Sequence, residues 1–325
     1  MLRSMYLLNK RAKMNKIYYP VVIPTLCRFT HFKRCIESLV QCTYADKTEV
    51  IIGLDYPLKE EHKQGYKQIC EYLPTISGFK KVTIIRRTEN WGALRNWQSL
   101  REYTFQHNDA LIYSEDDNEF SPCFLDFMNK ALVKYKDDNH IMSISGYNPV
   151  LYYGVQNSNV YCTPVSYAWG MGIWKDKENE FKSSLEYISK GNCILKSYFY
   201  SYKLFKAVPT SFNLLISMAK KGMEWEDVIR TSFNVLYGRV QLRPSISIVR
   251  NWGHDGSGEH CGVDKGMTEQ KILIQSTFEL DAISEYISIG KKIKLLFVDD
   301  LGYHRKRIFL RRIIILYRYL FYKFA

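Results

Sequence analysis

Three consecutive carboxylates, Glu115, Asp116 and Asp117, follow a short apolar segment at 111–113. Like charges a few ångströms apart raise one another's pKa, and a divalent cation removes that conflict. A bound diphosphate would supply the remaining oxygen ligands of such a cation. The pattern therefore indicates a metal and nucleotide site, although a polar turn after a strand produces the same residue pattern about as often.

Three other segments hold residues suited to such a site. Arg28, in the loop after the first predicted strand, would present a fixed cation to a nucleotide, and a surface arginine is the alternative. Segment 224–227 offers Asp227 as a base at a helix start, where acids also occur because they stabilise the helix dipole. Segment 250–260 has three glycines and Ser257. Its N–H groups and hydroxyl suit phosphate oxygens, and an ordinary surface turn is the alternative.

Strands and helices are predicted to alternate over the first half of the chain. Runs of β-branched and aromatic residues predict strands, and amphipathic periodicity predicts helices. We expect strands at 17–24, 49–54, 81–86, 110–114 and 140–145, and helices at 32–41, 62–72, 91–106 and 124–135. This alternation predicts parallel βαβ units, which place ligands at the carboxyl ends of strands. Asp55 and Asp116 both follow such ends.

The composition changes after Pro149. Segment 147–174 is rich in Tyr, Trp and Gly and is expected to be mainly loop. Its aromatic rings would either fill a core or provide the faces against which sugar rings pack. Helices are expected after it, near 180–190, 195–207, 211–221 and 228–237. We expect this second region to pack on the first without a flexible linker.

The formal charge of +13 lies at the two ends of the chain. Residues 1–16 carry +5, residues 291–325 carry +8, and residues 17–290 are formally neutral. A basic protein can bind nucleic acid through its charge alone. Because the body is neutral, we do not expect a nucleic acid partner.

The segment 305–325 combines arginines with many apolar residues. Arg307, Arg311 and Arg318 fall within about 40° of one another on a helical wheel. The arginines recur too often for a membrane span of ~20 apolar residues. A basic amphipathic helix lying on an anionic bilayer fits better, and a helix docked on the core or on a second subunit is the alternative.

The eight cysteines form no C-x-x-C pair and no cluster with histidine. This argues against zinc and against structural disulfides. No apolar stretch of signal-peptide length follows the basic residues near the N-terminus, so we expect a cytoplasmic protein, associated peripherally with the inner face of the cell membrane. Met14 directly precedes the first strand and is hypothesised to be the true start. Detection of residues 1–13 by mass spectrometry of the native protein would remove that hypothesis.

Four segments, in this order, resemble one family of enzymes. They are 21–39 with its arginine-bearing loop, 49–61 with Asp55 after a strand, 113–128 with the Glu-Asp-Asp run, and 225–260. Together they are similar to nucleotide-sugar glycosyltransferases of the GT-A fold. More narrowly, the sequence resembles the inverting N-acetylglucosaminyltransferase I group and bacterial polysaccharide glycosyltransferases of the family 2 type. One segment alone is a weak match, but four in order are strong.

The resemblance implies a role for each candidate residue. Asp117 would bind the metal, Mn²⁺ or Mg²⁺, and Asp227 would deprotonate the acceptor hydroxyl. The other residues would contact the nucleotide or the donor sugar: Arg28, Asp55, Glu115, Asp116 and Ser257. The metal would neutralise charge on the leaving diphosphate, and a base on the opposite face of the sugar would make the reaction a single inverting displacement.

The resemblance also implies a fold and a function. The fold would be α/β, with a GT-A (Rossmann-like) mostly parallel sheet flanked by helices. Residues 17–149 would bind the nucleotide sugar, 150–290 would form an acceptor and catalytic region, and 291–325 a basic amphipathic tail. The function would be metal-dependent transfer from an NDP-sugar, first of all a UDP-sugar, to a glycan or lipid-linked acceptor in surface polysaccharide biosynthesis. The alternatives are a sugar nucleotidyltransferase and a catalytically inactive, membrane-associated binding protein.

Overall fold

The computed structural model describes most of the chain. The described residues are 17–149, 159–189, 192–222, 225–257, 263, 268–280 and 305–324. The hypothesis about Met14 falls outside them, as does the first part of the predicted tail, residues 291–304.

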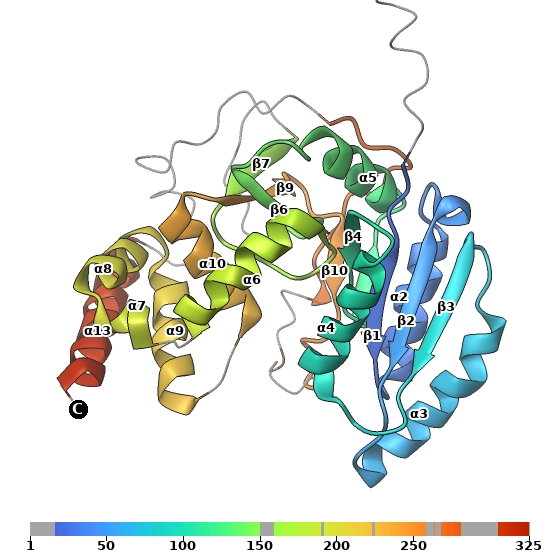
Figure 1. The fold of residues 1–325 in the computed structure, drawn as a ribbon, viewed down its shortest axis with the longest axis horizontal. Helices are drawn as coiled ribbons and strands as arrows, with labels where there is room; N and C mark the ends of the chain where they lie inside the picture. The colour runs from blue at the N-terminus through green and yellow to red at the C-terminus, as the bar shows by residue number, and fades with distance from the viewer. Residues whose placement is uncertain are drawn as a thin grey trace, which may run out of the picture.

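An eight-stranded sheet forms the centre of the protein, with strand order β3-β2-β1-β4-β8-β6-β9-β7 (Figure 1). Its strands are β1 (Val21–Thr25), β2 (Glu49–Leu54), β3 (Lys81–Arg86), β4 (Ala110–Tyr113), β6 (Ile141–Ser145), β7 (Val160–Thr163), β8 (Met171–Trp174) and β9 (Val240–Pro244). Strands β7 and β8 run antiparallel to the other six. The predicted mostly parallel α/β sheet is therefore confirmed. The sheet takes strands from both sides of residue 150, and the predicted division into regions stays a prediction.

Helices cover both faces of the sheet, so its central strands are apolar on both sides. In β1, Val21 and Ile23 pack towards one face, and Val22 towards the other. The helices of the first half are α2 (Phe29–Val40), α3 (Glu60–Tyr72), α4 (Gly92–Phe105) and α5 (Phe124–Lys134), with short 3₁₀ turns at Ala45–Lys47 and Leu73–Thr75. Helix α2 buries Phe32, Cys35, Ile36 and Leu39 at the i, i+3, i+4, i+7 spacing of an amphipathic helix.

The expectation of a loop over 147–174 is wrong for two segments, β7 and β8. Strand β8 lies in the middle of the sheet between β4 and β6, and the rings of Tyr147 and Trp174 are buried. Each of these strands has only four residues. Such short runs leave too little alternation to distinguish a strand from an aromatic loop.

A second, two-stranded sheet connects the acidic run to the glycine-containing segment. Strand β5 (Asn118–Phe120) pairs antiparallel with β10 (Val249–Asn251), and Asn118 faces Asn251. The sequence did not predict this ribbon. It brings residues about 130 positions apart in the chain to the same place.

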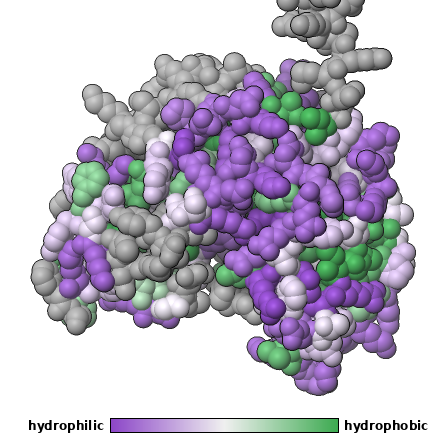
Figure 2. Space-filling view, viewed as in Figure 1, coloured by the Kyte–Doolittle hydropathy of each residue, from purple (hydrophilic) through white to green (hydrophobic). Residues whose placement is uncertain are grey.

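The later helices form a second apolar core at the end of the molecule away from β3 and α3 (Figure 1). They are α6 (Lys175–Ser189), α7 (Asn192–Lys196), α8 (Tyr198–Ala207), α9 (Pro209–Lys221), α10 (Glu226–Tyr237) and α13 (Arg305–Phe324). The surface over the first half of α6 is hydrophilic (Figure 2). Among the helices in the described ranges, none combines the length and the hydropathy that crossing a bilayer requires.

Candidate active site

The acidic run lies between β4 and β5, at the carboxyl end of the sheet, and Arg28 joins two of its members. The Arg28 guanidinium forms ion pairs with Asp116 and, at 2.8 Å, with Asp117 Oδ2. Thr25 at the end of β1 donates its hydroxyl to Asp116 Oδ2 over 2.9 Å. Both carboxylates are buried. Arg28 is therefore part of the site that the sequence predicted, and its charge offsets that of the two aspartates.

The second sheet holds Asp117 from the other side. Asn251 donates from Nδ2 to Asp117 Oδ1 over 2.6 Å, and the Trp252 N–H donates to the Asp117 carbonyl over 2.8 Å. The backbone of Gly253 lies so close that a Cβ there would be 2.2 Å from Asp117 Oδ2. Only glycine fits at this position without moving the carboxylate, which explains one glycine of the 250–260 segment.

Burial and mutual repulsion disfavour full ionisation of the acidic run. Burial, followed by the charge of Asp117, raises the pKa of Glu115 to about 8, although Arg28 opposes this. Burial also raises the pKa of Asp117, again against Arg28. A further cation would favour ionisation of both groups. The charge of Asp227 also contributes to the raised pKa of Glu115, so these two carboxylates lie within electrostatic range of each other.

The donor atoms fit a divalent cation only as a site shared with a ligand. Among the residues that the structure describes, no group of three or more His, Cys, Asp and Glu side chains converges to hold a metal ion. What the protein offers is the carboxylate of Asp117, which the backbone of Gly253 approaches closely because that residue has no side chain. Carboxylate oxygen suits Mn²⁺ or Mg²⁺, and Mg²⁺ is commonly bound by one or two carboxylates together with substrate phosphates.

Asp55 lies at the neighbouring strand end. Its N–H donates to the Thr25 carbonyl over 2.9 Å, and its Oδ1 accepts the N–H groups of Tyr56 and Trp91, each over 2.9 Å. One carboxylate oxygen thus orders the loops after β2 and β3. The site that Asp55 shares with Thr25 is continuous with the acidic run, because Thr25 contacts Asp116.

Two arginines that the sequence analysis did not single out lie against Trp91, whose N–H binds Asp55. The guanidinium groups of Arg87 and Arg95 lie 4.0 and 4.1 Å from the centre of the Trp91 ring. Arg87 directly follows β3, the third parallel strand. Its position at a strand end is the signal that would have found it.

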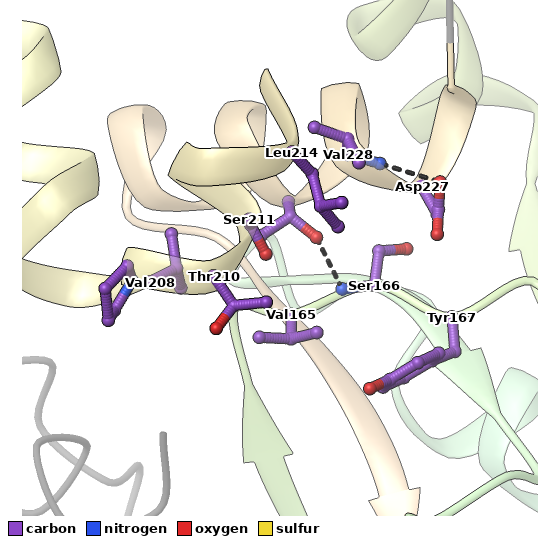
Figure 3. A pocket seen from close by; sticks show the side chains of 11 residues that line it. Val165, Ser166, Tyr167, Val208, Thr210, Ser211, Leu214, Asp227 and Val228 are labelled. Atoms are coloured by element: carbon purple, nitrogen blue, oxygen red, sulfur yellow. Dashed lines mark hydrogen bonds between the residues drawn. The ribbon is translucent and has the colours of Figure 1, made fainter. Parts of the chain in front are cut away.

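Asp227 lies in the first turn of α10 and faces a pocket (Figure 3). Its carboxylate is exposed through the pocket, and its Oδ1 accepts the N–H of Val228 over 2.9 Å. The pocket walls nevertheless desolvate the Asp227 carboxyl group, and this raises its pKa against the opposing effect of the hydrogen bond from Val228. Asp227 and Tyr167 lie on one side of the pocket and Val208 on the other. The remaining lining residues are Val165, Ser166, Pro209, Thr210, Ser211, Leu214, Val228 and Thr231.

A buried ionic network fixes the start of α10. Arg230 donates to Glu226 Oε1 over 2.9 Å from Nε and to Glu178 Oε1 over 2.8 Å from Nη2. Arg101 on α4 forms an ion pair with the same oxygen of Glu178. Although burial opposes ionisation, the two arginines lower the pKa of Glu226. The network joins α4, α6 and α10 and holds the residue that precedes Asp227.

Ser257 is tied to helix α2 through Asp255. Asp255 Oδ1 accepts the Ser257 N–H over 2.9 Å and its hydroxyl over 2.6 Å, while Asp255 Oδ2 lies 3.0 Å from His31 Nε2. Electrostatic attraction to His31 also opposes the rise in the pKa of Asp117. Ser257 therefore lies on the Arg28 side of the acidic run. Its hydroxyl proton is already donated to Asp255.

A match to a family model, within the first 206 residues, decides the family of the chain. A model of glycosyl transferase family 2 matches residues 21–206, which is more than half of the chain. The chain belongs to glycosyl transferase family 2. This confirms the predicted resemblance, and the predicted enzyme class is that of the family. Among curated proteins, no sequence matches the chain significantly.

Solved structures show low-level likeness to this member of glycosyl transferase family 2. Staphylococcus aureus TarS is 12% identical with a TM-score of 0.33, over 54% of this chain and 30% of TarS. Residues 1–349 of TarS, in complex with UDP-GlcNAc, are 12% identical with a TM-score of 0.35, over 51% of this chain and 48% of that one. The mannosyltransferase PcManGT from Pyrobaculum calidifontis, in complex with GDP-Man and Mn²⁺, is 11% identical with a TM-score of 0.36, over 72% of this chain and 76% of that one. The chain thus spans 30% of the length of TarS.

Proposed function

We propose that the protein transfers a sugar from a nucleoside diphosphate donor to an acceptor hydroxyl. The observation that carries this proposal is the pairing of two acidic sites. A buried cluster at the strand ends carries Arg28 and Asp117, and an exposed carboxylate, Asp227, opens into a separate pocket. Glu115, in the buried cluster, lies within electrostatic range of Asp227. Membership of glycosyl transferase family 2 supports the same reaction class.

On the donor side, Arg28 would pair with the diphosphate in place of part of its present contact with Asp116. Asp55 would contact the nucleoside through the carboxylate oxygen that does not bind the loop N–H groups. Glu115 and Asp116 would contact the ribose or the donor sugar, and Ser257 would approach the diphosphate. We propose UDP as the nucleotide, as the resemblance of the sequence implies.

Asp117 would hold a divalent cation, Mn²⁺ or Mg²⁺, together with the donor diphosphate. When bound, such a cation neutralises charge that develops on the leaving diphosphate. Arg28 lies 2.8 Å from Asp117 Oδ2 and would supply positive charge to the same oxygens. Asn251 keeps the carboxylate oriented by binding its other oxygen.

On the acceptor side, Asp227 would accept the proton of the attacking hydroxyl. The raised pKa of Asp227 brings it nearer to neutral pH, which favours a general base. The pocket beside it combines hydroxyl groups with the ring of Tyr167, and such a lining suits a glycan. With donor and base on opposite sides of the sugar carbon, a single displacement would invert its configuration. We propose a glycan or lipid-linked acceptor in surface polysaccharide biosynthesis, at the inner face of the cell membrane.

Three aspartate variants test the assignment of roles. Asp117→Ala should abolish transfer and weaken metal-dependent nucleotide binding, because it removes the cation ligand. Asp227→Asn should abolish transfer and leave nucleotide binding intact, because it removes only the base. Asp46→Asn, in an exposed 3₁₀ turn, is the matched control and should leave both unchanged. Full activity in either site variant, or undiminished turnover in EDTA, would contradict these roles.

A further inference from the structure

Helix α13 is docked on the protein along one side. Ile315 and Tyr319 are buried in the helical core, and the Tyr319 hydroxyl donates to the Leu195 carbonyl over 3.0 Å. Arg318 donates to Asn213 Oδ1 over 2.5 Å and to Ser217 Oγ over 3.1 Å, both on α9. Arg318 therefore faces the protein, whereas the helical wheel had grouped it with arginines expected to face a bilayer. For this side of the helix, the docked alternative of the sequence analysis describes what is found.

The opposite side of α13 is apolar and exposed. At about 100° per residue, the exposed side chains cover an arc of about 160° that is opposite Ile315 and Tyr319. Their exposed fractions lie between 41% and 68%, and they are Ile313, Ile314, Leu316, Tyr317, Leu320 and Phe321. A contiguous apolar area of this kind marks an interaction surface rather than ordinary exposed residues.

Helix α8 extends this area. Tyr198, Phe199 and Tyr202 are exposed to between 60% and 69%. Lys323 of α13 connects the two helices, because its Nζ lies 3.3 Å from the centre of the Tyr198 ring and donates to the Lys196 carbonyl over 2.7 Å. Figure 1 shows α8, α9 and α13 together at this end of the molecule. We call these three residues and the six of α13 the α8–α13 surface.

The charged side chains of the three helices at the α8–α13 surface are all positive. Lys220 of α9 lies 5.4 Å from the Phe321 ring, and Lys206 lies 5.7 Å from the Tyr202 ring. Helices α8, α9 and α13 contain no Asp or Glu. Residues 291–325 as a whole carry a formal charge of +8. Aromatic rings next to lysines and arginines are typical of the boundary between bilayer and water.

We infer that the α8–α13 surface docks on the surface of an anionic lipid bilayer. The apolar and aromatic side chains would enter the headgroup boundary, and the flanking lysines would pair with lipid phosphates. A second copy of the chain, packed through its own apolar arc, would not account for the lysines around the surface. An anionic bilayer matches both the apolar arc and the positive charge. The partner is therefore a lipid surface and not a second copy of this chain.

Docking in this way would bring the pocket of Asp227 close to the bilayer. Helix α9 lies along α13, and its first residues, Pro209, Thr210, Ser211 and Leu214, line that pocket. The acceptor would then be a molecule held at the bilayer surface, such as a lipid-linked glycan. This second step rests on the proposed function, whereas the docking itself does not.

Flotation of the full-length protein with vesicles tests the docking. Binding to vesicles of phosphatidylcholine with phosphatidylglycerol should exceed binding to phosphatidylcholine alone and should fall as salt is added. The Ile313→Ser, Ile314→Ser double variant, at sites 50% and 52% exposed, should lower the partition coefficient at least about tenfold. The matched control is Ile246→Ser, Ile274→Ser, at sites 55% and 80% exposed elsewhere on the protein, and should bind as the unaltered protein does.

A charge variant keeps the test independent of helix packing. Lys206→Gln, Lys220→Gln should reduce the preference for anionic vesicles and leave the melting temperature unchanged. Equal binding by both isoleucine variants would overturn the inference. Binding that does not depend on phosphatidylglycerol would also overturn it. The same holds for a dimer in solution that forms with every variant except Ile313→Ser, Ile314→Ser.

Measuring sugar transfer to two forms of the acceptor separates the docking from the proposed function. Transfer to an acceptor embedded in vesicles should fall about tenfold in the Ile313→Ser, Ile314→Ser variant, and transfer to a detergent-solubilised acceptor should not change. Absence of all transfer by the unaltered protein would contradict the proposed function, and flotation would still report on the docking. Equal loss on both acceptors would overturn the link between the surface and the acceptor.

Discussion

Replacing Gly253 with alanine should damage the site through a single contact. The added Cβ would lie 2.2 Å from Asp117 Oδ2 and 3.1 Å from Asn251 Oδ1. Non-bonded carbon and oxygen atoms approach to roughly 3.2 Å, so the carboxylate or the loop must move by about 1 Å. Asp117 cannot move freely, because Asn251 binds its Oδ1 over 2.6 Å and Arg28 lies 2.8 Å from its Oδ2.

The magnitude follows from that displacement. A misplacement of about 1 Å in a catalytic group costs on the order of 100-fold in rate. We therefore expect kcat/KM of Gly253→Ala to fall about 100-fold, equivalent to about 2.7 kcal/mol of transition-state stabilisation. Metal-dependent nucleotide affinity, measured by calorimetry, should fall with it, because Asp117 is the proposed metal ligand.

Gly238 provides the control. It ends helix α10 with φ of 69°, and a Cβ there would meet no atom within 4 Å. Gly238→Ala should therefore cost about 1 kcal/mol of unfolding free energy through backbone strain and leave kcat/KM nearly unchanged. Unaltered nucleotide affinity and kcat/KM in Gly253→Ala would contradict the proposed effect on Asp117, as would equal loss of activity in the two variants.

Three further predictions concern charge. Burial raises the pKa of Glu115 to about 8, so the folded protein keeps a proton that the unfolded chain loses near pH ~4.3. Stability from this group therefore falls as pH rises between those values, and Glu115→Gln should raise the melting temperature by a few degrees at pH 8.5 and far less at pH 5. Glu178→Gln should cost roughly 3–5 kcal/mol of unfolding free energy, because Arg101 and Arg230 lose their shared partner. It should also lower kcat more than nucleotide affinity. Asp55→Asn keeps an oxygen for the loop N–H groups, so calorimetry should show weaker nucleotide binding at an unchanged melting temperature.

The parallel part of the fold could be predicted because its strands are continuous apolar runs. The predicted strands at 49–54 and 81–86 have the bounds of β2 and β3. The ribbon of β5 and β10 could not be predicted, since each strand has three residues and the pairing joins distant parts of the chain. Such a pairing leaves no periodic pattern in either segment.

The candidate site divides in the same way. Arg28 and the acidic run lie at strand ends, which a sequence can indicate once the strands are known. The ionic network of Arg101, Glu178 and Arg230 joins three helices, and no local spacing indicates it. Helix α13 is apolar on nearly every side, so a helical wheel does not indicate which side packs on the protein. The predicted orientation of Arg318, towards a bilayer, was wrong for that reason.

Identification of the nucleotide product distinguishes sugar transfer from nucleotidyl transfer. The full-length protein, in detergent with Mn²⁺ and a lipid-linked glycan acceptor, would be incubated with a panel of nucleotide sugars, and the products separated by chromatography. We expect free nucleoside diphosphate, formed together with a glycoside of inverted configuration, and neither product with Asp227→Asn. Release of pyrophosphate, or a glycoside of retained configuration, would contradict it.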